Sequence, residues 1–187
     1  MSEFFMFDEV GVDKKPGTYT KGDWEKYAVH GPNEIRGFFS EYRWLSNFYD
    51  TPVYFDGVLY RSSESAYQAA KVIPSQRSVF ENCKAYDAKR MWRDSKLVKL
   101  YSAADWDNVK YDIMLAVVFD KFYRNVELRD KLVSTRGAYL EELNHWSDQY
   151  WGVDIRMGGC NNLGQILMIV RKVWSINQKT YAISPVP

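Results

Sequence analysis

A single carboxylate stands out in the segment SSESAYQAAK, residues 62–71. The segment predicts a short helix whose buried face carries Ala66, Ala69, Ala70 and Ile73. Ser65 and Gln68 have the spacing of a capping box at its start. A carboxylate in the first turn lies near free backbone amides and the positive end of the helix dipole, which favour its ionised form. Glu64 is therefore a candidate base or charge stabiliser, and the alternative is a solvated stripe shared with Gln68 and Lys71.

Aromatic and basic side chains are the other groups that could meet a ligand. The chain contains 17% aromatic residues, so some rings are candidates for contact with a flat ligand. Ser102 and Asp105 form an S-x-x-D helix start that places Trp106 in the first turn, where an indole either packs in the core or faces a ligand. The segment AKRMWRDSKLVK, residues 88–99, is basic, and it is either a solvated helix surface or a phosphate contact.

Two further patterns predict the elements that position these groups. Asp56 and Gly57 separate two alternating apolar runs, which predicts a β-hairpin with a type I′ turn. Residues 127–142 favour a third helical region that breaks near Gly137.

A glycine-rich loop precedes the last helical pattern. Gly152, Gly158 and Gly159 make the loop flexible, and Asn162 with Gln165 has the spacing of a helix start. The helix after it has an apolar stripe formed by Leu163, Ile166, Leu167 and Val170. The loop is either a plain connection or a source of backbone amides for a phosphate.

Composition limits the class of protein. The 187 residues suit one domain, and 25 Lys+Arg against 24 Asp+Glu give no broad positive field for non-specific nucleic-acid binding. Neither His30 nor His145 has a Cys or His neighbour at zinc-site spacing, so we expect no metal and no cofactor, although carboxylates alone can bind magnesium. We expect free thiols at Cys83 and Cys160. No stretch approaches the ~20 apolar residues of a membrane span, and the N-terminus lacks the charge order of a secretory signal, so we expect a cytoplasmic protein without a membrane partner.

Five sequence blocks follow one another along the chain: RWLSNFY, DGVLYRSSESAYQAAK, AKRM, DWDNVKYDIM, and YWG followed by GG and NNLGQILMIVR. In this order and spacing they resemble the YbiA-like family, also called the NADAR superfamily, from about Gly37 to Trp174. The resemblance implies an α+β fold, a single helix-rich domain with a small antiparallel sheet. It also implies N-glycosidase activity on ribosylated amines. Members are linked to ribosylamino-pyrimidine phosphates of the riboflavin pathway, and others to removal of ADP-ribose from guanine bases.

The resemblance implies three catalytic positions. Glu64 matches the family's glutamate in its T-S-E-H block, Trp106 matches the tryptophan of W-x-x-V-K, and Asp148 matches the acidic position three residues before W-G. Ser65 replaces the histidine that usually follows the glutamate, a departure that bears on substrate identity and on whether activity is retained. We expect Glu64, Trp106 and Asp148 to converge on one pocket.

We assign substrate binding to eight further residues. Five belong to the matched blocks: Asn47, Trp151, Gly152, Gly159 and Asn161. Three are basic candidates for a phosphate contact, Arg61, Lys71 and Arg90, of which Arg61 and Arg90 are assigned by their charge and not by the resemblance.

The expected function is hydrolysis of the C–N bond between ribose and an amine or base in a phosphorylated ribosyl compound. A nearby ionised carboxylate stabilises the positive charge that develops on the sugar, or orients the attacking water. The expected partner is a small nucleotide-like substrate, with ADP-ribosylated nucleic acid as a second candidate. The alternative function is a module that binds NAD or ADP-ribose without hydrolysis. We expect an irregular N-terminal arm over residues 1–34, the YbiA-like domain over 35–176 and a C-terminal tail over 177–187.

Overall fold

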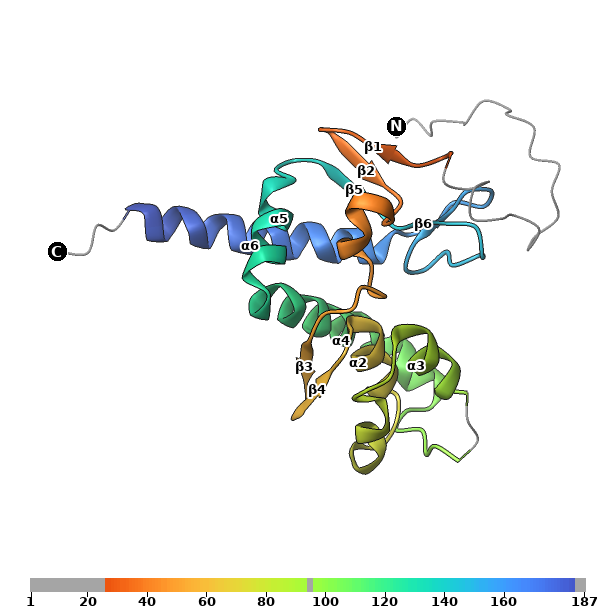
Figure 1. Cartoon of the computed structure of the whole chain (residues 1–187). Coiled ribbons are helices and arrows are strands. Elements are labelled where there is room, and N and C mark those ends of the chain that lie inside the picture. Colours follow the sequence, from red (N-terminus) through yellow and green to blue (C-terminus); the bar gives the residue numbers. More distant parts are fainter. Residues whose placement is uncertain (1–25, 94–95, 184–187) are drawn as a thin grey trace.

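The computed structural model describes residues 26–93 and 96–183 of the chain (Figure 1). Most of the predicted N-terminal arm, residues 1–25, and the end of the predicted tail, residues 184–187, lie outside the described residues. The elements in chain order are β1 (Val29–His30), β2 (Glu34–Arg36), the 3-10 helix η1 (Ser40–Leu45), β3 (Val53–Phe55), β4 (Val58–Tyr60), α2 (Ser63–Ala69), the 3-10 helix η2 (Pro74–Phe80), α3 (Ala85–Met91), α4 (Ala103–Arg124), α5 (Val126–Ser134), β5 (Tyr139–Glu141), β6 (Leu143–Asn144), β7 (Val153–Asp154) and α6 (Asn162–Ile183).

Helix α4 is the element on which both halves of the fold pack. It contacts β3, α2, α5 and α6, and Figure 1 shows it between a group with β1, β2, β5, α5 and α6 and a group with β3, β4, α2 and α3. The Ser102 hydroxyl accepts a hydrogen bond from the Asp105 amide at 3.1 Å, which confirms the predicted helix start. The fully buried apolar residues of α4 are Met114, Val117, Val118 and Phe122.

Three small sheets accompany the helices. Strand β1 pairs antiparallel with β2, and β2 pairs in parallel with β5, so that Ile35 lies opposite Leu140. Strands β3 and β4 form the predicted hairpin, and Asp56 and Gly57 have the positive φ values, 46° and 85°, of a type I′ turn. Strands β6 and β7 are parallel. The helix-rich α+β fold is confirmed, and the largest sheet is mixed rather than antiparallel because β5 returns beside β2 from a distant part of the chain.

Helix α2 begins earlier and ends earlier than the sequence pattern predicts. The Ser62 hydroxyl accepts the hydrogen bond from the Ser65 amide at 3.1 Å, so Ser62 is the cap and the capping box of Ser65 and Gln68 is wrong. Ile73 lies beyond the helix in an extended conformation, with ψ at 147°, because a residue before proline avoids the helical region and Pro74 follows.

Residues 127–142 contain one helix and one strand. Helix α5 ends at Ser134, and Arg136 then adopts a left-handed φ of 52°. The predicted break near Gly137 is confirmed, but the helix predicted after it is wrong. Residues of β5 pair with β2 instead, and Leu140 is fully buried between that sheet and α6.

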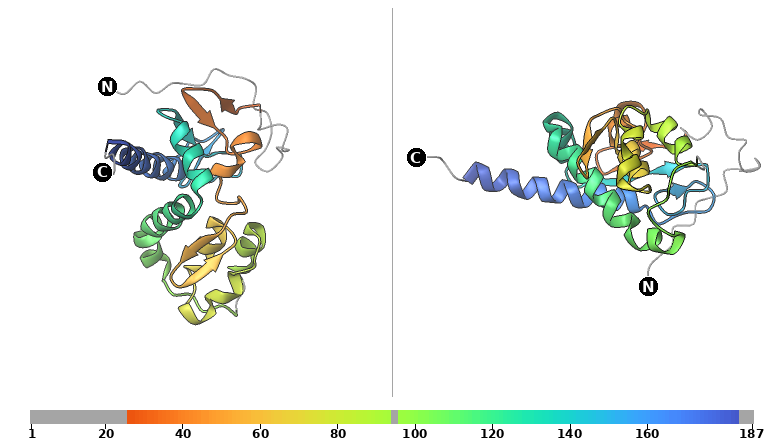
Figure 2. Two further views of the ribbon diagram at one scale, coloured as in Figure 1. Left: turned by 60° about the vertical axis from the view of Figure 1, so that its left-hand side comes forward. Right: turned by 90° about the horizontal axis from the view of Figure 1, so that it is seen from below.

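Helix α6 anchors the C-terminal half of the domain. Its predicted stripe is confirmed as buried: Leu163, Ile166, Leu167 and Val170. The far end of α6 leaves the body of the molecule (Figures 1 and 2) and continues to Ile183, past residue 177 where we expected a tail to begin. Cys83 and Cys160 are free thiols, as predicted. Over the described parts of the chain, no helix combines the length and apolar character needed to cross a membrane.

Gly164→Ala is expected to destabilise the protein. A Cβ atom at Gly164 would lie 2.1 Å from the carbonyl oxygen of Leu140, so α6 and β5 would have to separate. Overpacking costs about 1–3 kcal/mol, which exceeds the ~1 kcal/mol that alanine gains over glycine within a helix. Thermal unfolding measures the loss. Gly137→Ala is the control, because a Cβ there meets no atom within 4 Å. Equal melting temperatures for the two variants would contradict the close approach.

Candidate active site

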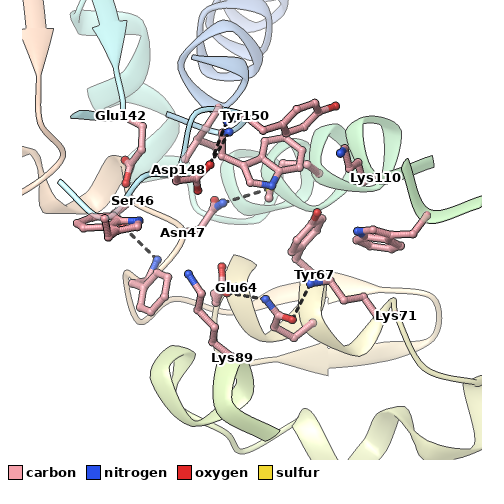
Figure 3. Close-up of a pocket in the computed structure, with 17 residues that line it drawn as sticks. Ser46, Asn47, Glu64, Tyr67, Lys71, Lys89, Lys110, Glu142, Asp148 and Tyr150 are labelled. Atoms are coloured by element: carbon pink, nitrogen blue, oxygen red, sulfur yellow. Dashed lines mark hydrogen bonds between the residues drawn. The ribbon is translucent and has the colours of Figure 1, made fainter. Parts of the chain in front are cut away.

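A pocket of about 270 Å³ collects side chains from distant parts of the sequence. Its walls come from the segment after η1, from α2, α3 and α4, from the chain between β5 and β7, and from the first turn of α6 (Figure 3). The lining residues are Ser46, Asn47, Phe48, Glu64, Tyr67, Gln68, Lys71, Lys89, Trp106, Lys110, Met114, Glu142, Trp146, Asp148, Tyr150, Trp151 and Leu163.

The structure brings some of the assigned residues to this pocket and leaves others outside its lining. The lining includes Asn47, Glu64, Lys71, Trp106, Asp148 and Trp151. Outside the lining lie Arg61, Arg90, Gly152, Gly159 and Asn161. Of the segment from Trp151 through the glycine-rich loop, Trp151 lines the pocket, and Gly152, Gly158 and Gly159 do not.

Arg61 and Arg90 lie at the surface in ion pairs. Arg61 Nη2 is 2.6 Å from an Asp50 carboxylate oxygen, and Arg90 Nη2 is 3.3 Å from one of Asp87. Both arginine side chains are exposed, by 44% and 74%. Neither arginine lines the pocket, since each is turned toward an acidic neighbour outside it. Their assignment to a phosphate stays a prediction.

Gly152, Gly159 and Asn161 support the pocket wall from behind. A Cβ at Gly152 would lie 2.3 Å from the Glu142 carbonyl oxygen, and one at Gly159 would lie 2.1 Å from the Gly152 carbonyl oxygen. The Asn161 side chain accepts a hydrogen bond from the Glu142 amide at 3.1 Å and donates one to the Leu140 carbonyl at 2.9 Å. These residues therefore hold the backbone that carries Glu142 and do not face the cavity.

Glu64 is buried, and hydrogen bonds hold both its carboxyl group and its backbone amide. Its Oε1 accepts a hydrogen bond from Gln68 at 2.7 Å, and its backbone amide donates to the Asn47 carbonyl at 3.0 Å. Burial raises the pKa of Glu64, although Lys89, Gln68 and Lys71 oppose the shift. Glu64 is 6% exposed, so the solvated stripe is wrong, and burial outweighs the expected preference of the helix start for the ionised form.

Asp148 and Glu142 face Glu64 across the pocket (Figure 3). One Asp148 oxygen accepts hydrogen bonds from the amides of Tyr150 and Trp151, at 3.2 and 2.9 Å, and so fixes the aromatic wall. The Oε2 atom of Glu142 is buried and has no hydrogen-bond partner among the described residues. Burial, together with the negative charge of Asp148, raises the pKa of Glu142 to about 8.

Lys121 lies behind the pocket in the core. It is 1% exposed, and its ammonium group donates a hydrogen bond to the Ser46 carbonyl at 2.9 Å. Burial, and to a lesser degree the charge of Arg43, lowers the pKa of Lys121 to about 7. The carbonyl that Lys121 holds belongs to the segment that carries Asn47 into the pocket.

Aromatic rings and lysines form the remaining wall. The Tyr67 ring centre lies 5.2 Å from that of Trp106 and 5.5 Å from that of Trp151. Lys71 Nζ lies 4.9 Å from the Tyr67 ring centre and donates to the Gln68 oxygen at 2.9 Å, so that a hydrogen-bonded chain links Lys71 to Glu64. Burial lowers the pKa of Lys71 to about 8. The wall therefore offers rings to a flat group and cations to an anion.

Sequence reasoning missed Glu142, Lys89 and Lys110 as pocket residues. Lys110 follows Trp106 by four positions in α4, and this spacing places both on one helix face, a signal that was available. Lys89 belongs to the basic segment whose phosphate interpretation was left open. Glu142 had no usable signal, because its position was assigned to a helix. In the described residues, no group of three or more His, Cys, Asp or Glu side chains is arranged to hold a metal ion.

The arrangement matches a known family. The family model of the NADAR domain matches residues 34–174. The chain belongs to the NADAR domain family. The resemblance seen in the five sequence blocks is thereby confirmed.

Relatives of the NADAR domain agree with this assignment. The chain is 32% identical over 141 residues to N-glycosidase YbiA of Escherichia coli, which covers 74% of this chain and 85% of that protein. It is 34% identical over 143 residues to the riboflavin biosynthesis protein VVA0006 of Vibrio vulnificus, covering 75% of this chain but only 36% of the Vibrio protein. The NMR structure of E. coli YbiA aligns with a TM-score of 0.68 at 30% identity, covering 81% of this chain and 90% of that one.

Ser65 stands where the resemblance led us to expect histidine, and it turns away from the pocket of this NADAR domain. Its hydroxyl donates a hydrogen bond to the Cys83 carbonyl at 2.9 Å, and the residue is fully buried. Ser65 is therefore part of the packing of α2 on the chain before α3, and it does not line the pocket.

Glu142→Gln is expected to stabilise the protein at about pH 8. Because the pKa of Glu142 is raised from 4.5 to about 8 in the folded state, the folded state keeps a proton that the unfolded state loses, and wild-type stability falls as the pH rises through this window. The neutral amide removes this slope, so the variant should gain about 4 kcal/mol at the upper end. Urea unfolding at about pH 5 and about pH 8 measures the gain.

Glu127→Gln is the control for this measurement, because Glu127 is 82% exposed and pairs with Lys131 at the surface. It should keep the wild-type slope. If Glu142→Gln keeps that slope as well, Glu142 does not hold a proton in the folded state.

Proposed function

We propose that the protein is an N-glycosidase, a hydrolase that cleaves the C–N bond between ribose and an amine or base. The observation that supports it is the convergence of Glu64, Glu142 and Asp148 on one pocket walled by aromatic rings and lysines. The NADAR family match and a relative named N-glycosidase that covers 74% of the chain support the same activity.

The chemistry needs a negative group beside the sugar and a base for water. As the C–N bond lengthens, positive charge develops on the ribose carbon, and a preorganised carboxylate in a buried site stabilises it. Glu64 is placed for this role, since Gln68 fixes the orientation of its carboxyl group at 2.7 Å. Its raised pKa makes the carboxylate a stronger base toward the attacking water. Asp148 adds a second negative group on the facing wall.

The substrate class that fits best is a ribosylamino-pyrimidine phosphate. A cavity of about 270 Å³ lies just below the ~300–1,000 Å³ of common ligand sites, which favours one nucleotide-sized molecule over the larger ADP-ribose. Trp106 and Tyr67 offer faces to a flat heterocycle, and Lys71, Lys89 and Lys110 offer charge to a phosphate. The Vibrio relative, named a riboflavin biosynthesis protein, supports a pyrimidine of that pathway.

Glu64→Gln is expected to abolish turnover and leave the fold intact. The amide keeps the volume and the contact with Gln68 but removes the negative charge. Loss of about 3–4 kcal/mol of transition-state stabilisation lowers kcat by roughly two to three orders of magnitude. The purified protein and the variant are incubated with a ribosylamino-pyrimidine phosphate, NAD and ADP-ribosylated guanosine. Products are then read by mass, and melting temperatures are recorded in parallel.

Glu127→Gln on α5 is the control, since it makes the same chemical change at an exposed site. Near-normal turnover by Glu64→Gln would remove Glu64 from the mechanism. If the wild type binds ADP-ribose and cleaves none of the three compounds, the protein is a binding module and the proposed hydrolase activity is wrong.

A further inference from the structure

We propose that Glu142 is the general acid of this site and donates the proton that the leaving nitrogen needs as the ribose C–N bond breaks. The proposal rests on the N-glycosidase function proposed above and adds a catalytic residue to it. Neither the sequence motifs nor the resemblance pointed to Glu142.

The position of Glu142 supports this role. Glu142 directly follows β5 and lines the pocket on the same wall as Asp148. Figure 3 shows its carboxyl group reaching from that wall, with Glu64 on the other side of the pocket. Its Oε2 atom is buried and lacks a hydrogen-bond partner within the described residues. Buried polar atoms without a partner are rare in native proteins, and a catalytic role is one of their common explanations.

Hydrogen bonds fix both the backbone amide and the backbone carbonyl of Glu142. Its amide donates to the Asn161 side chain at 3.1 Å, and its carbonyl accepts from the Val153 amide at 2.9 Å. Gly152 lies so close that a Cβ atom there would come within 2.3 Å of this carbonyl. Asn161 and Gly152, both assigned to substrate binding from the sequence, therefore position Glu142. A carboxyl group on a fixed backbone is what proton transfer to a bound substrate needs.

Burial is the main reason that Glu142 keeps a proton at neutral pH, and the neighbouring charges modify its effect. Asp148 and Glu64 raise its pKa, and Arg43 and Lys121 lower it, while burial contributes most and brings the pKa to about 8. The pKa of Lys121 is itself lowered to about 7, so this cation weakens as the pH rises toward the range where Glu142 titrates. A neutral carboxyl group near its pKa at the working pH is an effective proton donor.

The step balances with one molecule of water. The C–N bond breaks, its electron pair passes to nitrogen, and nitrogen takes the proton from Glu142. The oxygen of water bonds to the ribose carbon, and its proton passes to the Glu64 carboxylate. The products are the free amine and a ribose phosphate, and the proton on Glu64 returns to Glu142 through solvent before the next turnover.

Two substrates with different leaving groups test the role. A ribosylamino-pyrimidine phosphate releases an amine that needs a proton, whereas 4-nitrophenyl riboside 5-phosphate releases a nitrophenolate that does not. We expect Glu142→Gln to lower kcat on the first by about 100-fold or more and on the second by less than about 5-fold, in line with general acid catalysis. Lys71 also has a pKa of about 8, but it meets the phosphate that both substrates carry. We therefore compare the two substrates: the ratio of wild-type kcat/KM on the first to that on the second should fall above about pH 8, and this alkaline limb of the ratio should be absent in the variant.

Glu141→Gln is the matched control, because the neighbouring carboxyl group lies outside the pocket lining and 3.9 Å from Arg36. It should leave both rates and the alkaline limb unchanged. Glu142→Asp, which keeps a proton donor on a shorter side chain, should retain the limb and part of the rate on the first substrate.

The remaining outcomes contradict either the acid role of Glu142 or the proposed function. An equal loss of kcat on both substrates, or an alkaline limb that persists in Glu142→Gln, overturns the acid role. The N-glycosidase function still stands in that case if the wild type cleaves the first substrate. A wild type that cleaves neither substrate overturns the proposed function and the role of Glu142 with it.

Discussion

The burial of carboxyl groups close to one another is the constraint on which this site depends. Glu64, Glu142 and Asp148 face one pocket, and loss of water together with mutual repulsion raises the pKa of the first two. The three carboxyl groups differ in the hydrogen bonds that replace the water that they lose. Gln68 donates to Glu64, two backbone amides donate to Asp148, and Oε2 of Glu142 has no such donor in the described residues. Similar side chains thereby acquire different affinities for a proton, which acid–base chemistry requires.

Helix α4 couples this electrostatic arrangement to the stability of the fold. Trp106 and Met114 on this helix line the pocket, while Val117 and Phe122, farther along the same helix, are buried in the core. Lys121 on the same helix holds the Ser46 carbonyl next to the pocket. A buried lysine with a lowered pKa costs stability that an apolar residue would not cost. Helix α4 therefore packs in the core and also supports the pocket segment that contains Ser46.

Elements that depend on residues close together in the sequence were predictable from it. Elements and orientations that depend on residues far apart in the sequence were not. The Asp56–Gly57 hairpin and the start of α4 depend on neighbouring residues and were predicted correctly. Glu142 was missed because β5 exists only through pairing with β2, which lies far away in the sequence. The orientation of Arg61 away from the pocket lining could not be predicted from its charge, because its side chain turns toward Asp50. Family motifs located Glu64 at the pocket, but its burial depends on the packing of the whole domain.

The pocket is built from segments that span most of the domain, from Ser46 to Leu163 in the first turn of α6. Chains are made from the N-terminus at about 5–20 residues per second. A nascent chain on the ribosome therefore holds α2 and α4, with their polar pocket residues, before the last wall has been synthesised. Since β5 also packs against α6, Glu142 reaches its final surroundings only after that helix has emerged. The site is consequently assembled late in the synthesis of the protein. A chain truncated before α6 would contain Glu64 without the completed wall that faces it.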